Sequence, residues 1–264
     1  MNENNLDYLQ NTLKYLGFGE SLTEPLRAAI ENGPEEFKLD FKNFQPAPHA
    51  KDKPELADAM VYVLDFSKSK ESELYFFNKY QASLQKPGQD TKLEQTFYVN
   101  KGKGVTVKES YNLLSGRAVN KDVVLKSGDK ANLWMKLDFS DHSPEKGYAM
   151  NTYGEQYGFH LKDTIDRFKI LDMEKPGFSD QLLKSLERGN LHGVSFMKNG
   201  KETTGFVAAN PQFKTLDFYN ADLSQVYSKS VDRHEGPEKK EVANNGEMLS
   251  ENARVSQEKN GMAR

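Results

Sequence analysis

The segment AMVYVLDFS, residues 59–67, and the segment ELYFFNKYQASL, residues 73–84, are separated only by the polar residues 68–72. Both segments are rich in aromatic and aliphatic side chains, which is typical of strands, and the charged residues between them predict a turn. Together they predict a β-hairpin. The same signals predict further strands at residues 37–41, 95–99, 122–125, 131–140, 147–159, 191–198, 201–209 and 213–220.

Helical periodicity appears between these strands. Leu6, Leu9 and Leu13 share one face of a helix, and Gly17 is placed to end it. Ser-x-x-Glu at 21–24 and Thr-x-x-Glu at 106–109 have the form of capping boxes, which predicts helix starts. The predicted helices lie between Asn4-Asn5 and Gly17, between Ser21 and Asn32-Gly33, at 105–116, from Leu161 through Phe168, and from Phe178 to Gly189.

The pattern predicts an α+β fold. Gly-Phe pairs at 17–18 and 177–178 precede similarly spaced apolar residues, which indicates two related helix-helix-strand units with antiparallel hairpins. We predict a first α+β unit with a central helix at 1–125 and a second α+β unit at 126–227. Residues 228–264 contain no aromatic residue and carry seven basic and seven acidic side chains. A disordered tail is therefore predicted there.

The tripeptide Leu-Asp-Phe occurs four times, starting at Leu39, Leu64, Leu137 and Leu216. In a strand, Leu and Phe point to one face and the Asp between them points to the other. This favours a structural role, with apolar pairs in the core and carboxylates in solvent. The alternative is an enzyme of an unrecognised type, in which Asp65, Asp138 and Asp217 converge on magnesium, calcium or manganese.

Composition excludes several functions. The formal net charge is -3, so the whole molecule does not attract nucleic acid or acidic membranes. The absence of cysteine excludes disulfides and thiolate chemistry. The N-terminus does not have the pattern of a signal peptide, and no segment is apolar enough to span a bilayer. We expect a soluble, cytoplasmic protein without membrane contact.

Catalytic motifs are absent from the sequence. It contains no G-x-S-x-G elbow, no Walker A loop and no dinucleotide fingerprint. The five histidines are never two, three or four residues apart, so no local zinc pair exists. We therefore expect a non-enzymatic protein with no catalytic residue, metal or cofactor.

Basic residues are concentrated between Tyr98 and Lys130, a segment that contains seven lysines and arginines but only three acidic residues. Lysines bind phosphates and aromatic rings stack on bases, so this segment has the side chains to hold a single-stranded nucleic acid. The alternative is a solvated charged surface over buried aromatics. The candidate nucleic-acid-binding residues are Tyr98, Lys101, Lys103, Lys108, Arg117 and Lys121.

A second hypothesis is a protein-protein adaptor that uses exposed aromatic residues and the flexible tail. Tyrosines are frequent anchors of interfaces, and equally frequent on the strand faces of monomers. The candidate anchors are Tyr75, Tyr80, Tyr153 and Tyr157. The sequence does not predict an oligomeric state.

The chain resembles an uncharacterised bacterial family, a domain of unknown function carried on conjugative and integrative elements of gut anaerobes. The resemblance rests on YLGFG at 15–19, YFFNKY at 75–80, QTFYVNKGKG at 95–104, NLLSGRAVNK at 112–121 and ANPQFKTLDFY at 209–219. Members are often encoded near, or fused with, topoisomerase-like genes. The resemblance thus implies an accessory role in DNA processing or transfer, with a DNA-processing protein or nucleic acid as partner, and it implies no catalytic residues.

Overall fold

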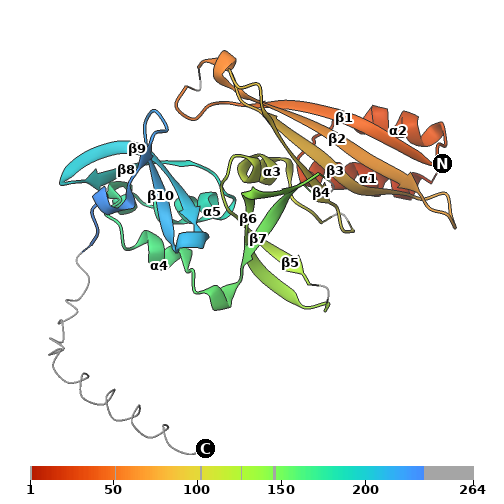
Figure 1. Cartoon of the computed structure of the whole chain (residues 1–264). Coiled ribbons are helices and arrows are strands. Elements are labelled where there is room, and N and C mark those ends of the chain that lie inside the picture. The colour runs from red at the N-terminus through yellow and green to blue at the C-terminus, as the bar shows by residue number, and fades with distance from the viewer. Residues whose placement is uncertain (1, 51, 102, 126, 145–146, 235–264) are drawn as a thin grey trace, which may run out of the picture. The chain divides into compact units, whose positions relative to one another are not determined.

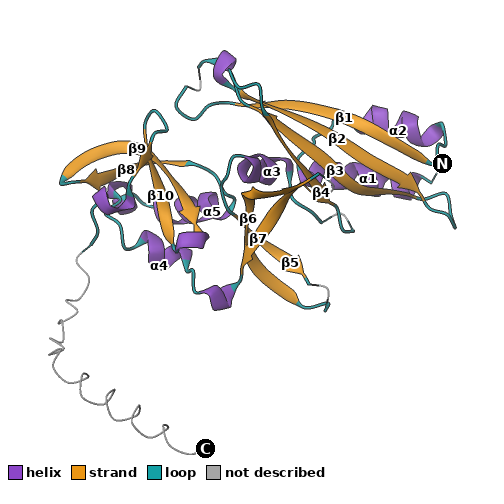
Figure 2. Cartoon of the chain, in the orientation of Figure 1, coloured by secondary structure: helices purple, strands orange, loops and turns teal. Residues whose placement is uncertain are grey.

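The computed structural model describes residues 2–50, 52–101, 103–125, 127–144 and 147–234. Helices and antiparallel sheets make up this part of the chain (Figure 1), and the strands form three separate sheets (Figure 2). The predicted α+β class is confirmed. Residues up to His234 form one compact unit. The rest of the predicted tail, residues 235–264, lies outside the described residues.

Two helices precede the N-terminal sheet in the sequence. Its four strands lie side by side in chain order, each antiparallel to the next. Its elements are α1 (Glu3–Leu16), α2 (Thr23–Glu31), β1 (Glu36–Gln45), β2 (Asp58–Lys68), β3 (Tyr75–Gln85) and β4 (Lys92–Tyr98). The predicted hairpin is β2–β3, in which Leu64 lies opposite Tyr80. As predicted, α1 ends at Gly17, whose φ of 91° is a left-handed conformation that glycine adopts without strain.

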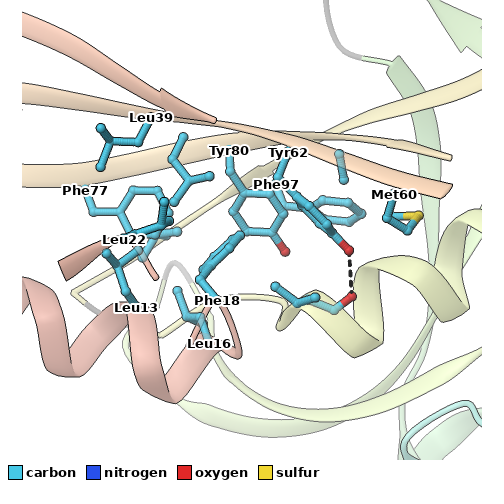
Figure 3. Close-up of a cluster of buried hydrophobic side chains, with 14 of the residues drawn as sticks. Leu13, Leu16, Phe18, Leu22, Leu39, Met60, Tyr62, Phe77, Tyr80 and Phe97 are labelled. Atoms are coloured by element: carbon cyan, nitrogen blue, oxygen red, sulfur yellow. Dashed lines mark hydrogen bonds between the residues drawn. The ribbon is translucent and has the colours of Figure 1, made fainter. Parts of the chain in front are cut away.

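Phe18 connects α1 to the sheet. Its N–H donates to the carbonyl of Leu13 at 3.0 Å, which turns the chain back over the helix end. Its buried ring then lies among four aromatic rings, those of Phe41, Tyr62, Phe77 and Tyr80, with ring centroids 5.3 to 6.0 Å apart and edge-to-face geometry. Figure 3 shows Phe18 with the rings of Tyr62, Phe77 and Tyr80 in the buried cluster. Helices α1 and α2 therefore cover one face of the N-terminal sheet.

The central part consists of a short helix and a three-stranded antiparallel sheet. Its elements are α3 (Val107–Leu114), β5 (Val119–Val124), β6 (Lys130–Ser143) and β7 (Gly147–Tyr153). Trp134 and Met135 are neighbours in β6 and so point to opposite faces. Met135 joins the N-terminal core, whereas Trp134 joins the core of the C-terminal part. The central sheet is thus shared between two buried clusters.

The predicted capping box at the start of α3 is confirmed, and its loss should be measurable. The Thr106 hydroxyl accepts from the N–H of Glu109, and the Glu109 carboxylate accepts from the N–H of Thr106 at 2.7 Å. Thr106→Ala leaves one N–H of the first turn without its partner, so we expect a loss of about 1 kcal/mol in the free energy of unfolding. Urea titration measures this. Thr106→Ser keeps the oxygen, and a loss as large as that of Thr106→Ala would contradict the capping argument.

The C-terminal part has two helices and a four-stranded antiparallel sheet in the order β11-β10-β9-β8. Its elements are α4 (Leu161–Ile165), α5 (Phe178–Glu187), β8 (His192–Lys198), β9 (Lys201–Asn210), β10 (Thr215–Asn220) and β11 (Gln225–Val226). The rings of Phe196 and Phe218 pack together at its centre. Asn199 and Gly200 form the predicted hairpin turn, both with positive φ, as this tight turn requires.

Three sequence predictions need correction. Ser21 does not cap α2, because the helix begins at Thr23 after a turn in which Thr23 N–H donates to the Glu20 carbonyl. Helix α4 ends before Phe168, whose backbone instead forms a β-bridge to Arg233. Residues 228–234 belong to the folded unit and not to the tail: Val231 is buried and bridges Lys198.

A duplicated helix-helix-strand unit is not confirmed. The order helix, helix, strand does occur twice, at α1-α2-β1 and at α4-α5-β8. The two Gly-Phe pairs have different roles, however, since Gly17 ends α1 whereas Gly177 precedes α5. The predicted boundary between residues 125 and 126 lies between β5 and β6 in the sequence, and these two strands pair with each other.

The Leu-Asp-Phe tripeptides lie on strands, and their carboxylates do not converge. Asp65, Asp138 and Asp217 belong to three different sheets. Asp65 forms ion pairs with Lys38 and Lys79. The side-chain amide of Asn210 donates to both carboxylate oxygens of Asp217, each at 2.9 Å. The four leucines are buried, as expected, but Phe139 is exposed.

Candidate functional site

A groove of about 1120 Å³ lies between the N-terminal sheet and β5. Its lining comes from α1, β3, β5 and the loop after β4. We call it the aromatic groove and define it by Tyr8, Phe76, Tyr98, Lys101 and Lys103, all of which line it. Three of these residues, Tyr98, Lys101 and Lys103, are among the six candidates predicted from the sequence.

The aromatic groove exposes three large rings. Tyr8 is 47% exposed, Phe76 48% and Tyr98 67%. They come from three different elements, α1, β3 and β4, and they share a lining with buried apolar side chains such as Val99 and Met135. Exposed aromatic rings gathered in one hollow are typical of a binding surface.

The loop after β4 presents the two lysines. Asn100 and Lys103 exchange two backbone hydrogen bonds of 2.8 and 2.9 Å, which closes a tight turn. Lys101 lies inside this turn with a φ of 49°, a left-handed conformation that is uncommon for a residue with a side chain. Lys101 and Lys103 are both exposed at the rim of the groove.

Two buried tyrosines fix the end of this loop to the sheet. The Tyr80 hydroxyl donates to the Val105 carbonyl. The Tyr62 hydroxyl donates to the Val107 carbonyl at 3.2 Å (Figure 3). Burial raises the pKa of Tyr62 to about 12 and the pKa of Tyr80 well above its ordinary value, because the phenolate would lose its hydration. Both hydroxyls therefore stay protonated donors that hold the end of the loop after β4 in place.

Lys121 lines the groove, but its charge is compensated. Its ammonium lies 2.8 Å from the Glu109 carboxylate, and both side chains are mostly buried. Glu109 is also the capping residue of α3, so this ion pair connects β5 to the start of the helix. Lys121 therefore brings a compensated charge to the groove, and its part in binding stays a prediction.

Lys108 and Arg117 do not line the aromatic groove. Lys108 donates to the Gln45 side chain at 2.9 Å, and Arg117 donates from Nε to the Gly189 carbonyl at 2.8 Å. Both border a different hollow, next to the start of β8. The six predicted residues therefore divide between two sites.

Sequence reasoning missed the basic residues that extend the groove. A neighbouring hollow of about 420 Å³ shares Lys103 and Lys121 with the groove and adds Lys184 and Arg188 from the last turns of α5, together with the exposed ring of Tyr15. We call this hollow the basic shelf. Lys184 and Lys103 are distant in the sequence, so no local pattern relates them.

The tyrosines of the adaptor hypothesis are mostly not available. Tyr75 and Tyr80 are buried in the N-terminal core. Tyr157 is exposed, but its hydroxyl donates to the Gln212 carbonyl and its ring lies beside that of Tyr153 at 4.8 Å. Exposed rings do occur elsewhere, at Phe44, Phe213 and Tyr227. An adaptor surface built on Tyr75 and Tyr80 is therefore wrong.

Metal ligands do not gather in the part of the chain that the structure describes. There, no group of three His, Asp or Glu side chains is placed to hold an ion. His192 is half-buried, and its pKa is lowered because the loss of hydration outweighs the opposing effect of the Asp172 carboxylate. Asp172 itself accepts from the N–H of Ser195 and pairs with Lys175, so it supports the start of β8.

None of the helices within the described ranges has both the length and the apolar character needed to cross a membrane. No family model, curated protein or solved structure matches the chain.

Proposed function

We propose that this chain is a non-enzymatic binding protein that holds a single-stranded nucleic acid in the aromatic groove. The observation that carries the proposal is the position of three exposed rings, Tyr8, Phe76 and Tyr98, in one hollow whose rim bears Lys101 and Lys103. Aromatic rings stack on unpaired bases of any sequence, and lysines follow the phosphates. A duplex hides its base faces, so single strands are the expected ligand.

The proposed path of the single-stranded nucleic acid continues from the groove onto the basic shelf. Lys103 borders both hollows, and Lys184 and Arg188 extend the positive charge beyond the groove. Asp122 and Glu187 reduce this charge, so the electrostatic contribution is moderate. Stacking in the groove therefore supplies a large share of the proposed affinity, and the lysines supply its salt dependence.

The resemblance to a family of conjugative and integrative elements gives this activity a setting. We propose an accessory role in DNA processing or transfer, where single strands are exposed and must be held. A DNA-processing protein is the second kind of partner in this setting. Its contact would use the same groove, because most of the exposed lining of this hollow is apolar.

The test of the proposal is the salt dependence of single-strand binding. We expect fluorescence anisotropy to show binding of single-stranded DNA and RNA that weakens as salt rises. The double variant Lys101→Asn/Lys103→Gln removes two phosphate contacts, and Asn tolerates the left-handed backbone of position 101. The slope of log K against log salt should fall by about 1.4, or roughly 0.7 for each lost contact.

A matched control removes the same charge elsewhere. Lys162 and Lys201 are exposed and line neither the groove nor the shelf, so Lys162→Gln/Lys201→Gln should leave the slope unchanged. Equal effects of both double variants would mean that net charge, and not the groove, governs binding. Absence of binding to any single strand would overturn the proposal and leave the protein partner as the occupant of the groove.

A further inference from the structure

Two adjoining hollows lie apart from the aromatic groove, around Arg117. The smaller has a volume of about 270 Å³ and the larger about 390 Å³. They share the lining residues Pro48, Tyr111, Arg117 and Leu191, and neither shares a lining residue with the aromatic groove. The larger one falls within the range of small-molecule pockets, roughly 300 to 1,000 Å³.

The ends of two helices hold Arg117 in place. At the end of α3, Gly116 has a φ of 82° and the Arg117 N–H donates to the Asn112 carbonyl at 3.0 Å. At the end of α5, Gly189 has a φ of 77°, and its carbonyl accepts from Arg117 Nε at 2.8 Å. Arg117 Nη2 also donates to Asn112 Oδ1 at 2.6 Å. These bonds use one edge of the guanidinium and fix its plane.

Two cations meet at one aromatic ring in this place. The Arg117 guanidinium lies 5.1 Å from the ring centre of Tyr111, and the Lys108 ammonium lies 4.9 Å from it. Neither cation lies within ion-pair distance of a carboxylate of the described residues. Reduced hydration and the nearby charge of Arg117 lower the pKa of Lys108, as expected for two cations that share one ring. A bound anion would relieve the repulsion between the two cations.

The linings of the two hollows differ in character. Lys108 and Arg117 line the smaller hollow, and no acidic side chain does. The larger hollow is lined by apolar side chains, including Leu56, Leu191 and Leu223, and by the polar rings of His49 and Tyr219. Its one carboxylate, that of Asp58, is engaged by the Tyr111 hydroxyl at 2.9 Å. An anionic head therefore fits the smaller hollow, and a partly apolar body fits the larger.

We propose that this pair of hollows binds a phosphomonoester, with the phosphoryl group between Lys108 and Arg117 and the organic part beside Leu191. Two cations match the double negative charge of a phosphomonoester better than the single charge of a carboxylate, and the planar guanidinium matches its oxygens. A free nucleotide and the terminal phosphate of an oligonucleotide both carry this group. This site is independent of the aromatic groove and does not rest on the proposed function.

Calorimetric titration with four probes tests the site. We expect adenosine 5′-monophosphate to bind, adenosine not to bind, and acetate and benzoate to bind more weakly than the monophosphate. Lys108→Gln should weaken the monophosphate roughly tenfold or more, since it removes a charge-assisted contact. Lys108 is exposed and makes no contact with Gly189, so this variant keeps the helix ends joined. Arg117→Lys keeps the charge and should also weaken binding, because the planar fork is lost.

Controls separate this site from the groove. Lys162→Gln removes one exposed lysine outside both hollows and should leave monophosphate binding unchanged. A 5′-phosphorylated tetranucleotide that binds more tightly than its unphosphorylated form, and loses that advantage in Lys108→Gln, would identify a strand end as the ligand. An advantage only for the free monophosphate would identify a nucleotide. Equal binding of adenosine and its monophosphate, or full binding by Lys108→Gln, would overturn the proposal.

Discussion

Replacing Phe76 and Tyr98 together by alanine is expected to weaken the binding of single-stranded DNA by at least about thirtyfold. Each base stacked on an aromatic ring contributes about 1–3 kcal/mol, so two rings contribute about 2 kcal/mol or more. Both rings are about half exposed or more, and neither belongs to the buried core. The fold should therefore be retained. Anisotropy titration at fixed salt measures the change in affinity.

Two comparisons define what this result would mean. Phe213→Ala/Tyr227→Ala removes two exposed rings outside the groove and should leave the affinity unchanged. Phe76→Tyr/Tyr98→Phe keeps both ring faces and should also bind normally, since stacking requires only the face of the ring. Loss of binding in this exchange variant would show that a hydroxyl group is recognised, and it would contradict the stacking argument. An unchanged affinity in the double alanine variant would exclude the groove as the binding site.

The strands were predictable because each has its own local pattern, but the faces of β3 were not. Phe77 and Tyr80 are both buried, although strict alternation would place them on opposite faces. The pairing explains this: Phe66 lies opposite Phe77, whereas Asp65 lies opposite Lys79, so β3 carries one extra residue. This bulge turns Tyr80 into the core. The sequence contains no local signal for the bulge. For this reason Tyr80 was wrongly predicted to be an exposed anchor of an adaptor surface.

The capping boxes show a similar limit. The same four-residue pattern is a true cap at Thr106 and has no capping bond at Ser21. At Ser21 the turn from Glu20 to Thr23 moves the N-cap by one residue, to Leu22, and the helix begins at Thr23. The pattern indicates that a helix follows, and its exact start depends on the preceding turn.

Part of the candidate site could be predicted because it is continuous in the sequence. Tyr98 ends β4, Lys101 and Lys103 follow it in the next loop, and the three residues stay together in the structure. Lys108 and Arg117 follow closely in the chain, but they lie around the ring of Tyr111, which does not line the groove. Tyr8 joins the aromatic groove, and Lys184 joins the basic shelf, only because tertiary packing brings distant elements together.

Phe18→Ala is expected to cost about 4 kcal/mol of the free energy of unfolding. Large-to-small changes of a buried phenylalanine cost about 3–5 kcal/mol, because apolar contact is lost and a cavity remains. Phe18 should lie in the upper part of this range, since its ring contacts four other rings edge-on and these are fixed in neighbouring strands. Small proteins have a total stability of about 5–15 kcal/mol, so this one change removes a large part of it. Urea unfolding followed by circular dichroism measures the loss.

The contrast with Tyr15 makes this prediction specific to the buried ring. Tyr15 lies three residues earlier, at the end of α1, and its side chain is exposed. Tyr15→Ala should change the stability by no more than about 0.5 kcal/mol, as is usual for surface positions. Phe18→Leu fills part of the cavity and should fall between the two. A loss below about 1 kcal/mol for Phe18→Ala would mean that the four rings close over the vacant space. Phe18 would then not be the residue that holds α1, which carries Tyr8, against the sheet.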